Sequence, residues 1–462
     1  MKFDLVLRGG KVVLPDTDGV MVNIAIRNGL IAALLVPDVK VEASETIDVA
    51  GTVVLPGVID VHLHLGHGKD IARPRVPEDA ATETAAAAIG GVTTFVPYLM
   101  ATDPFETLFD EVKAVTEAGA RIDFGYHFII STEAQLDGVP RYAREFGAPS
   151  FKIFMNNRGG EGARLGLPDI DDGFLLRLCE QAAAHGGMVC PHPENIEAAW
   201  VLRKRMMDND PEGRGGLPAW NASRPPFVEA DAVQRAAMFA RETKARLYIV
   251  HTSSRKALEA GLRARDAGTD ILIETCPHYL THDVQWQGGD VGKINPPLRE
   301  HDDCEALWAG ILSGDINTIA TDHVHRDISS KAGGIWKASP GCAGLETLLP
   351  VMLSDGHHNR KIGLGHIARL LSNAPADAMG LSHCKGRIAV GLHADLAVVD
   401  LDREYEYNRK DVRSSAGYSI YEGRRFKGQI VHTLVRGRFA VRNSTLIDES
   451  IGTGRYVSRT LN

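Results

Sequence analysis

The sequence has no long apolar run, which argues against a membrane-spanning helix. The longest purely apolar stretch, residues 30–36, has about seven residues, whereas a helix that crosses a bilayer needs about 20. The first residues also lack the pattern of a signal peptide, because Asp4 and Arg8 interrupt their apolar stretch. We therefore expect a cytoplasmic protein without a membrane partner.

Paired cysteines, basic clusters and repeats are missing as well. The six cysteines are scattered and form no C-x-x-C pair, so reduced thiols are the simplest interpretation. The formal net charge of −8 disfavours nucleic acid as a partner, because nucleic acid binds clustered Lys and Arg. The 462 residues, 44% hydrophobic and 24% charged, suffice for one large globular domain and a smaller one.

Both ends of the chain have the pattern of short strands. Segments 5–7, 11–14, 22–27 and 31–36 are separated by Gly-Gly, Pro-Asp and Asn-Gly turns. Segments 394–400 and 429–436 are strand-like in the same way. Two β-rich ends around a different middle predict one small β domain, assembled from residues 1–55 and 390–462.

The middle of the chain alternates apolar strands with helical segments. The predicted strands are 58–65, 92–99, 122–130, 150–155, 188–192, 246–252, 270–276 and 317–321. The predicted helices include 77–89, 103–118, 172–185, 230–243, 254–267 and 302–313. Eight such alternations predict an α/β fold, a parallel (β/α)8 barrel over residues 56–389. The polar segments 157–169 and 208–226 are expected to be loops after the fourth and fifth strands.

Histidine and aspartate residues stand at the ends of several predicted strands. His62 and His64 alternate along the first strand, so both imidazoles point to one side. His192, His251 and Asp322 end the fifth, sixth and eighth strands. The carboxyl ends of barrel strands share one rim, and neutral imidazole is a ligand for Zn, Co, Mn or Fe. The pattern therefore predicts a metal site.

Lys152 lies inside the fourth predicted strand, between Phe151 and Ile153. An ammonium among apolar side chains is costly unless it is paired or neutralised. It could extend to the barrel mouth, form a Schiff base, or react as a neutral amine with CO2 to give a carbamate. With four histidines and an aspartate at the same rim, we favour the carbamate. This anionic, bidentate group can bridge two divalent cations and leave room for a bridging water.

Nine short motifs occur in a fixed order. They are PGVIDVHLHL (56–65), GGVTTFV (90–96), SFKIFM (150–155), HPEN (192–195), YIVHTSS (248–254), ETCPHYL (274–280), NPPLR (295–299), ATDH (320–323) and GLHADLAVVD (391–400). With them the chain resembles, over nearly its whole length, the cyclic amidohydrolases of the amidohydrolase superfamily: dihydropyrimidinase, hydantoinase, allantoinase and dihydroorotase. The resemblance implies a TIM barrel with a β-sandwich formed by both termini, and a hydrolase acting on C–N bonds of cyclic amides.

The resemblance also implies a role for each ligand position. One metal would be bound by His62, His64 and Asp322 and the other by His192 and His251, with N6-carboxylysine at Lys152 as the bridge. The two divalent ions are expected to be Zn2+, with Mn, Co or Fe as alternatives. They would polarise the ring carbonyl and lower the pKa of the bridging water, so that hydroxide exists at neutral pH. Asp322 would take the proton and pass it to the leaving ring nitrogen.

Two signatures of these families are incomplete in this sequence. Hydantoinases and dihydropyrimidinases usually carry a tyrosine five residues after the carboxylated lysine, where it donates to the developing oxyanion; here that residue is Asn157. Dihydroorotases usually follow H-x-H with Leu-Arg, whereas Leu65 and Gly66 follow here. Stretch 331–346 is closest to the substrate loops of allantoinase and dihydroorotase. The candidate substrate-binding residues are therefore Asn157, Asn295, Arg326, Gly341 and Cys342.

Arg326 stands four residues after Asp322, where the residue in dihydroorotase-like TDHAPH segments helps bind the substrate carboxylate. An arginine is a permanently charged fork suited to a carboxylate or ureido group. We therefore expect an anionic or strongly hydrogen-bond-accepting substituent on the ring, with Arg73 and Arg75 adding to the same field. The alternative is that Arg326 faces solvent or pairs with Asp327.

The motifs leave several types of substrate ring as alternatives. Hydantoin, dihydropyrimidine and allantoin types compete with a carboxylated ring, as in a dihydroorotase-like enzyme. A catalytically inactive dihydropyrimidinase-related scaffold would have lost metal ligands, yet all six positions are present here. Deaminases of the superfamily generally lack the lysine that stands here at Lys152. We expect a small-molecule cyclic amide substrate and a homotetramer or homodimer.

Overall fold

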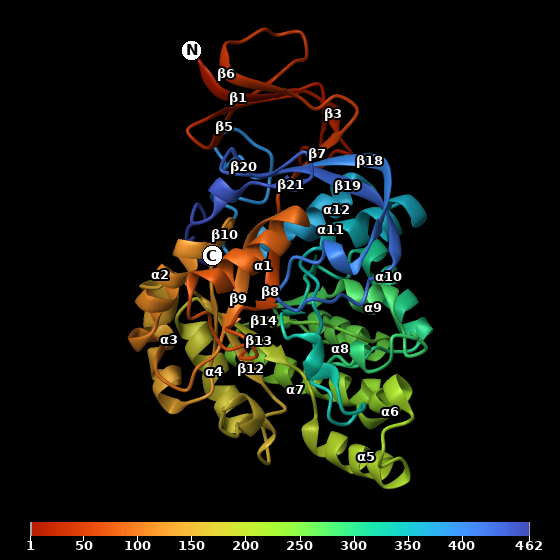
Figure 1. The fold of residues 1–462 in the computed structure, drawn as a ribbon. Coiled ribbons are helices and arrows are strands. Elements are labelled where there is room, and N and C mark those ends of the chain that lie inside the picture. The colour runs from red at the N-terminus through yellow and green to blue at the C-terminus, as the bar shows by residue number, and fades with distance from the viewer. Residues whose placement is uncertain (1, 462) are drawn as a thin grey trace.

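The computed structural model describes residues 2–461 as a barrel of parallel strands with two smaller β-sheets on one side of it. In Figure 1 the smaller sheets lie at the top, where red N-terminal and blue C-terminal strands meet, and the barrel with its helices lies below. Among the helices of residues 2–461, none combines the length and apolar character needed to cross a membrane.

Eight parallel strand positions follow one another around the barrel, as the alternation predicts. The third position is divided into β10 and β11, and the eighth into β16 and β17. Because β16 pairs with β15 and β17 pairs with β8, the two pieces of the last strand close the ring. The strands are β8 (Val58–His64), β9 (Val92–Leu99), β10 (Asp123–Phe124), β11 (His127–Ile129), β12 (Ser150–Phe154), β13 (Met188–His192), β14 (Arg246–Ile249), β15 (Ile271–Thr275), β16 (Thr318–Ile319) and β17 (His323–Val324).

Helices follow the barrel strands and pack small apolar faces against them. In α8, the inner face consists of Ala257, Leu258, Ala260 and Gly261, and Ser254 caps the helix by accepting from the Ala257 N–H. The principal helices are α1 (Pro77–Ile89), α2 (Phe109–Gly119), α3 (Glu133–Arg144), α4 (Asp172–Ala184), α5 (Ile196–Asn209), α6 (Gly216–Ser223), α7 (Pro226–Thr243), α8 (Arg255–Asp266), α9 (Pro277–Thr281), α10 (His301–Ser313), α11 (Leu348–Val351), α12 (Leu364–Ala368) and α13 (Ala374–Ala378).

Helix α6 lies inside segment 208–226, which the sequence predicts to be a loop. Leu217 and Trp220 on this helix are buried, and Trp220 Nε1 donates to the carbonyl of Ile294 at 2.8 Å. Packing therefore outweighs the weak helix propensity of the Gly, Pro and Asn residues around it. Segment 157–169 is mostly irregular, as expected, with the short 3-10 helix η2 (Glu161–Leu165).

Strands from both termini share the smaller sheets, as the β-rich ends predict. Strand β7 pairs with both β2 and β18, so the seven-stranded sheet combines the two ends of the chain. Leu7, Ile24, Leu396 and Leu434 belong to one buried cluster between the sheets. Their strands are β1 (Phe3–Arg8), β2 (Lys11–Val12), β3 (Val20–Met21), β4 (Asn23–Arg27), β5 (Leu30–Leu35), β6 (Ala43–Asp48), β7 (Val53–Pro56), β18 (Leu396–Tyr407), β19 (Arg424–Val435), β20 (Arg438–Arg442) and β21 (Thr445–Leu446). The domain boundaries at 55/56 and 389/390 stay predictions.

Candidate metal centre

Three buried groups meet where the first and last barrel strands end. His62 and His64 close β8, and Asp322 lies in the break between β16 and β17. One carboxylate oxygen of Asp322 is 3.1 Å from His62 Nε2 and 3.9 Å from His64 Nε2. The ligand atoms of the three residues lie within 4.8 Å of one another, and N and O donors so placed can hold a divalent ion.

A second pair of imidazoles adjoins this group. His192 ends β13, and its Nδ1 lies 2.8 Å from Nε2 of His251, which follows β14. The His251 ring is 5.3 Å from the His62 ring. Burial lowers the pKa of both His192 and His251, so these imidazoles are neutral and have lone pairs for a ligand. Nδ1 of His251 and of His64 is buried without a hydrogen-bond partner among residues 2–461.

Two of these residues have unusual backbone conformations. Asp322 has φ +48° and His251 has φ +41°, in the left-handed region that residues other than glycine seldom occupy. Such strain persists where the surrounding structure holds it, often at a functional site. At Asp322 the turn interrupts the last strand, and the carboxylate lies beside the imidazoles of β8.

Lys152 lies on β12 and is only 1% exposed. Its Nζ is 3.4 Å from His62 Nε2 and 4.6 Å from the centre of the Tyr98 ring. In the described part of the chain, no carboxylate approaches this amine within 4.0 Å. Burial lowers the pKa of Lys152, which favours the neutral amine that reacts with CO2.

Two buried carboxylates position the imidazoles, and sequence reasoning assigned neither of them a role. Glu274 accepts from His62 Nδ1 at 2.6 Å and from the His251 N–H at 2.8 Å. Asp60 accepts from the N–H of Thr321 at 3.1 Å and from that of His62 at 3.3 Å. Glu274 thereby leaves Nε2 of His62 facing the site, as carboxylates beside metal-binding histidines do. Both stand within the quoted motifs, but the motifs do not show what the carboxylates contact.

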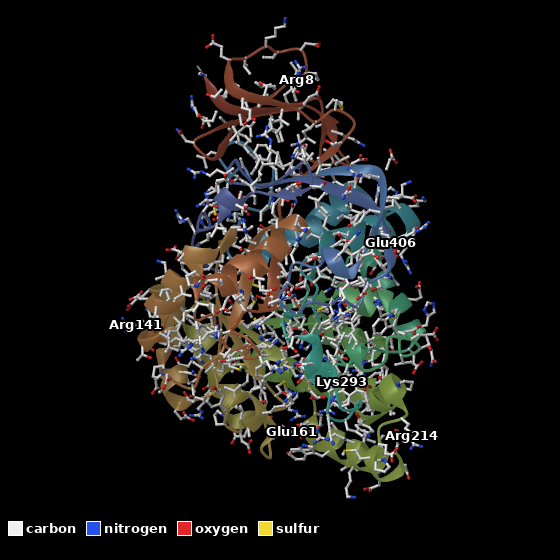
Figure 2. All side chains as sticks on the ribbon, in the orientation of Figure 1. Arg8, Arg141, Glu161, Arg214, Lys293 and Glu406 are labelled. Atoms are coloured by element: carbon white, nitrogen blue, oxygen red, sulfur yellow. The ribbon has the colours of Figure 1, made fainter. Side chains whose placement is uncertain are left out.

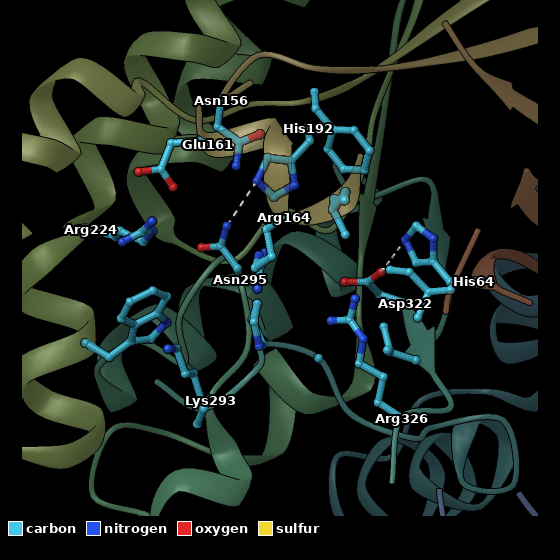
Figure 3. Close-up of a pocket in the computed structure, with 18 of the residues that line it drawn as sticks. His64, Asn156, Glu161, Arg164, His192, Arg224, Lys293, Asn295, Asp322 and Arg326 are labelled. Carbon is cyan, nitrogen blue, oxygen red and sulfur yellow. Dashed lines mark hydrogen bonds and ion pairs between the residues drawn. The ribbon is translucent and has the colours of Figure 1, made fainter. Parts of the chain in front are cut away.

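A cavity of about 450 Å3 opens beside these residues (Figure 3). Five of the six predicted metal ligands line it: His64, Lys152, His192, His251 and Asp322. Four of the five predicted substrate-binding residues line it too: Asn157, Asn295, Arg326 and Gly341. Cys342 lies behind the wall, with its thiol buried 4.0 Å from Nδ1 of His278.

The predicted substrate-binding residues differ in the hydrogen bonds that their side chains already make within the protein. Asn295 Nδ2 lies 3.3 Å from His192 Nε2, while its Oδ1 has no partner in the described chain. Nδ2 of the buried Asn157 likewise has no partner among residues 2–461. Arg326 lines the cavity and donates from Nε to the carbonyl of Lys69 at 3.4 Å, whereas Asp327 caps the turn at Ser329. Arg75 pairs with Asp70 instead of adding to the cavity.

Comparisons with known proteins give one family and a consistent set of relatives. Residues 250–440 match the family described as the amidohydrolase family. The chain is 31% identical to an L-hydantoinase from Paenarthrobacter aurescens over 99% of its own length and 98% of the relative's. It is 35% identical to an allantoinase from Solibacter usitatus, covering 94% of this chain and 93% of that one.

Solved structures agree with the arrangement of the chain. A D-hydantoinase structure superposes with a TM-score of 0.89 at 29% identity and covers 99% of both chains. The structure of an L-hydantoinase (dihydropyrimidinase) from Arthrobacter aurescens gives a TM-score of 0.89 at 28% identity, covering 99% of this chain and all of that one.

Proposed function

The chain belongs to the amidohydrolase superfamily, among its cyclic amidohydrolases, and on this premise we propose that its site opens a cyclic amide ring with two divalent metal ions. The observation that carries the proposal is the convergence of four imidazoles, one carboxylate and one buried, unpaired lysine at one rim of the barrel. A scaffold without activity would have no need to keep this set together.

The residues fit the metals chemically. His62, His64 and Asp322 would hold one ion, His192 and His251 the other, and carboxylated Lys152 would bridge them. Nitrogen and oxygen donors suit Zn2+, with Mn, Co or Fe as alternatives. When bound, such ions supply Lewis acidity toward a carbonyl oxygen and lower the pKa of water.

The hydrolysis needs one proton to be moved, and Asp322 is placed to move it. A water oxygen bonds to the ring carbonyl carbon, the C–N bond breaks, and the ring nitrogen leaves with a proton from that water. Asp322 lies at the centre of the cluster and lines the cavity, so its carboxylate can accept this proton and deliver it to the nitrogen. Glu274 and Asp60 keep the neighbouring imidazole and strand in place during the transfer.

The cavity supports a ring with hydrogen-bonding edges and an acidic substituent. Oδ1 of Asn295 and Nδ2 of Asn157, which lack partners among residues 2–461, can bind a ring N–H and a ring C=O group. Gly341 contributes backbone to the same wall, while Cys342 supports it from behind. Hydantoin, dihydropyrimidine and allantoin types all fit these groups, and Arg326 favours a ring with an anionic group, such as a carboxylated ring of dihydroorotase type.

A panel of rings tests the proposal. Metal-reconstituted protein should open at least one of hydantoin, dihydrouracil, allantoin, dihydroorotate and succinimide, and removal of the metal by a chelator should abolish the reaction. The proposal would be contradicted if protein that carries two metals per chain opened none of these rings.

The six cysteines are free in the structure, which fits the proposed cytoplasmic location. The proposed homotetramer or homodimer can be checked by light scattering.

A further inference from the structure

Positive charge is in excess around the cavity. Apart from Lys152, whose lowered pKa favours the neutral amine, its lining includes six cationic side chains: Arg164, Arg203, Arg224, Lys293, Arg326 and Lys337. Among residues 2–461, only two carboxylates, Glu161 and Asp322, line it with them. Such an excess in a concave site attracts anions. The location of the cations that lack counter-charges therefore indicates where an anionic group of a ligand would bind.

Two of these six cations are neutralised by neighbouring carboxylates. Arg203 forms a hydrogen-bonded ion pair with Glu161. Arg224 Nε lies 2.7 Å from an oxygen of the buried Glu194, and the guanidinium also stacks 4.2 Å from the Trp220 ring centre. These pairs already use the carboxylates on this side of the cavity.

Arg164 and Lys293 form no ion pair with a carboxylate among residues 2–461, although the charges of Glu161 and Glu194 reach Arg164 and that of Asp290 reaches Lys293. Within residues 2–461, Arg164 takes part in no hydrogen bond or ion pair, although it lines the cavity from η2. Lys293 is only 3% exposed, and its Nζ donates to the carbonyl of Trp336 at 3.2 Å and lies 4.2 Å from the Trp220 ring centre. Figure 3 shows Arg164 and Lys293 on the same cavity, with Asn295 beside them.

Lys293 lies in the positive field of neighbouring cations, one of which is Arg164. Burial, followed by the charges of Arg224, Arg164 and Lys331, lowers the pKa of Lys293 to about 7. Burial and the charge of Arg164 likewise lower the pKa of Arg326 to about 10. A bound anion would relieve this repulsion and form charge-assisted hydrogen bonds with both side chains. Figure 2 shows Lys293 and Glu161, which both line the cavity, in the half of the molecule away from the terminal sheets.

We propose that Arg164 and Lys293 form an anion subsite that binds a carboxylate at the end of a flexible substituent on the substrate ring. Lys293 stands two residues before Asn295, which lies beside His192, so the subsite continues outward from the ring position. Lys293, whose Nζ is held by the carbonyl of Trp336, provides an amine that a bound carboxylate would keep protonated, and the exposed Arg164 lines the same cavity from η2. This inference rests on the proposed ring-opening function and specifies its substrate: a cyclic amide with a distal carboxylate.

Equilibrium binding to the metal-reconstituted enzyme tests the subsite. The ligands are two hydantoins of equal length at position 5, one with a carboxypropyl and one with a neutral carbamoylpropyl group. Calorimetry should show the anionic ring binding at least tenfold more tightly to the wild type. Arg164→Leu and Lys293→Met should each weaken its binding by about tenfold, on the scale of a lost charged hydrogen bond, and should change the neutral ring by less than about twofold.

Lys337→Met is the matched control, because it removes an exposed cation from the same rim. It should leave the preference unchanged; a loss equal to that of Arg164→Leu would assign the preference to the general field and overturn the subsite. Equal binding of both rings, or binding of neither, would also overturn it. Arg164→Leu keeps the test valid if Lys293→Met does not fold. Turnover of the neutral ring without any charge preference would reject the subsite alone, whereas selective binding without turnover would reject the ring-opening function alone.

Discussion

At the scale of single residues, Lys152 has the environment that a carbamate requires. It is buried, faces His62 Nε2 at 3.4 Å and has a lowered pKa. Lys152→Ala should lose most of the bound metal and nearly all activity, because the bridge between the two ions is gone. Short carboxylic acids should restore part of the activity by replacing the carbamate. Metal analysis and turnover with and without acetate or propionate measure this.

Retention of two tightly bound metals and near-normal turnover in Lys152→Ala would show that the amine does not bridge. Lys204→Ala is a suitable control, since Lys204 is an exposed lysine on α5 that pairs with Asp208. It should keep full metal content and activity.

Asp322 should be both ligand and proton carrier. Asp322→Asn keeps the size of the side chain but removes the basic oxygen, so kcat should fall by about 1000-fold or more, over about 4 kcal/mol. A lost neutral hydrogen bond would explain only about 1 kcal/mol. Steady-state kinetics on a ring that the wild type opens is the measurement. A loss below tenfold would remove Asp322 from the chemistry.

The sequence predicted which side chains meet at the rim of the barrel better than it predicted the buried carboxylates that hold them. Alternation along β8 and the strand ends identified the histidines, because a strand has a fixed period of two. The same period cannot predict the hydrogen bonds from Thr321 to Asp60 or those that Glu274 accepts from His62 and His251. These contacts join residues 23 to 261 positions apart in the sequence. The positive φ at Asp322 is likewise a result of packing that no local pattern encodes.

At the scale of elements, Glu83 connects helix α1 to the end of the barrel. Its carboxylate lies 3.0 Å from His323 Nε2 and accepts from the N–H and hydroxyl of Ser415. Although burial raises the pKa of Glu83, the hydrogen bond and charge of His323 and the bond from Ser415 lower it to about 2. The ionised form is therefore stabilised in the folded protein.

This lowered pKa predicts a pH-dependent difference between the wild type and Glu83→Gln. The ordinary value is 4.5, so the stabilisation is complete above about pH 4.5 and is lost as the pH falls toward about 2. At pH 7 the wild type should be more stable by about 3 kcal/mol, and this difference should shrink below pH 4.5. Urea unfolding across this range measures it. A difference independent of pH would contradict the assignment, and Glu78→Gln at the exposed start of α1 is the control.

The order of elements was largely predictable from the sequence, and their ends were less so. Predicted helix 77–89 coincides with α1, and predicted strand 92–99 with β9. Helix α6 was missed because its stability comes from the burial of Trp220 and Leu217, not from local propensity. Strand eight was predicted as one piece, whereas the turn that places Asp322 divides it.

At the scale of the whole molecule, a buried ionic group joins the barrel to the strands of the C-terminal segment. Lys385 Nζ donates to Asp123 of β10 at 2.8 Å and also to Asp395, which precedes β18. Lys385→Met would leave both buried carboxylates without this partner, at a cost of about 3–5 kcal/mol. Thermal unfolding should show a large drop. Arg387→Met, which removes a partly exposed pair with Asp377, should cost less than about 1 kcal/mol, and equal effects would contradict the assignment.

Strands from both termini share one sheet beside the barrel. Within residues 2–461, no residue of the terminal sheets is among the residues that line the cavity, and Figure 2 shows these sheets at the other end of the molecule from Lys293 and Glu161. The site itself depends on six residues from five barrel strands brought to one rim. The central proposal for this site is that a carboxylated Lys152 bridges two metal ions.

The most direct test of that claim is 13C NMR of wild-type protein reconstituted with Zn2+ in the presence of 13C-labelled bicarbonate, with metal content determined on the same sample. The account predicts two zinc ions and one slowly exchanging carbamate carbon per chain, with the carbamate signal lost when a chelator removes the metal. Two bound metals without a carbamate signal, or a single metal per chain, would contradict it.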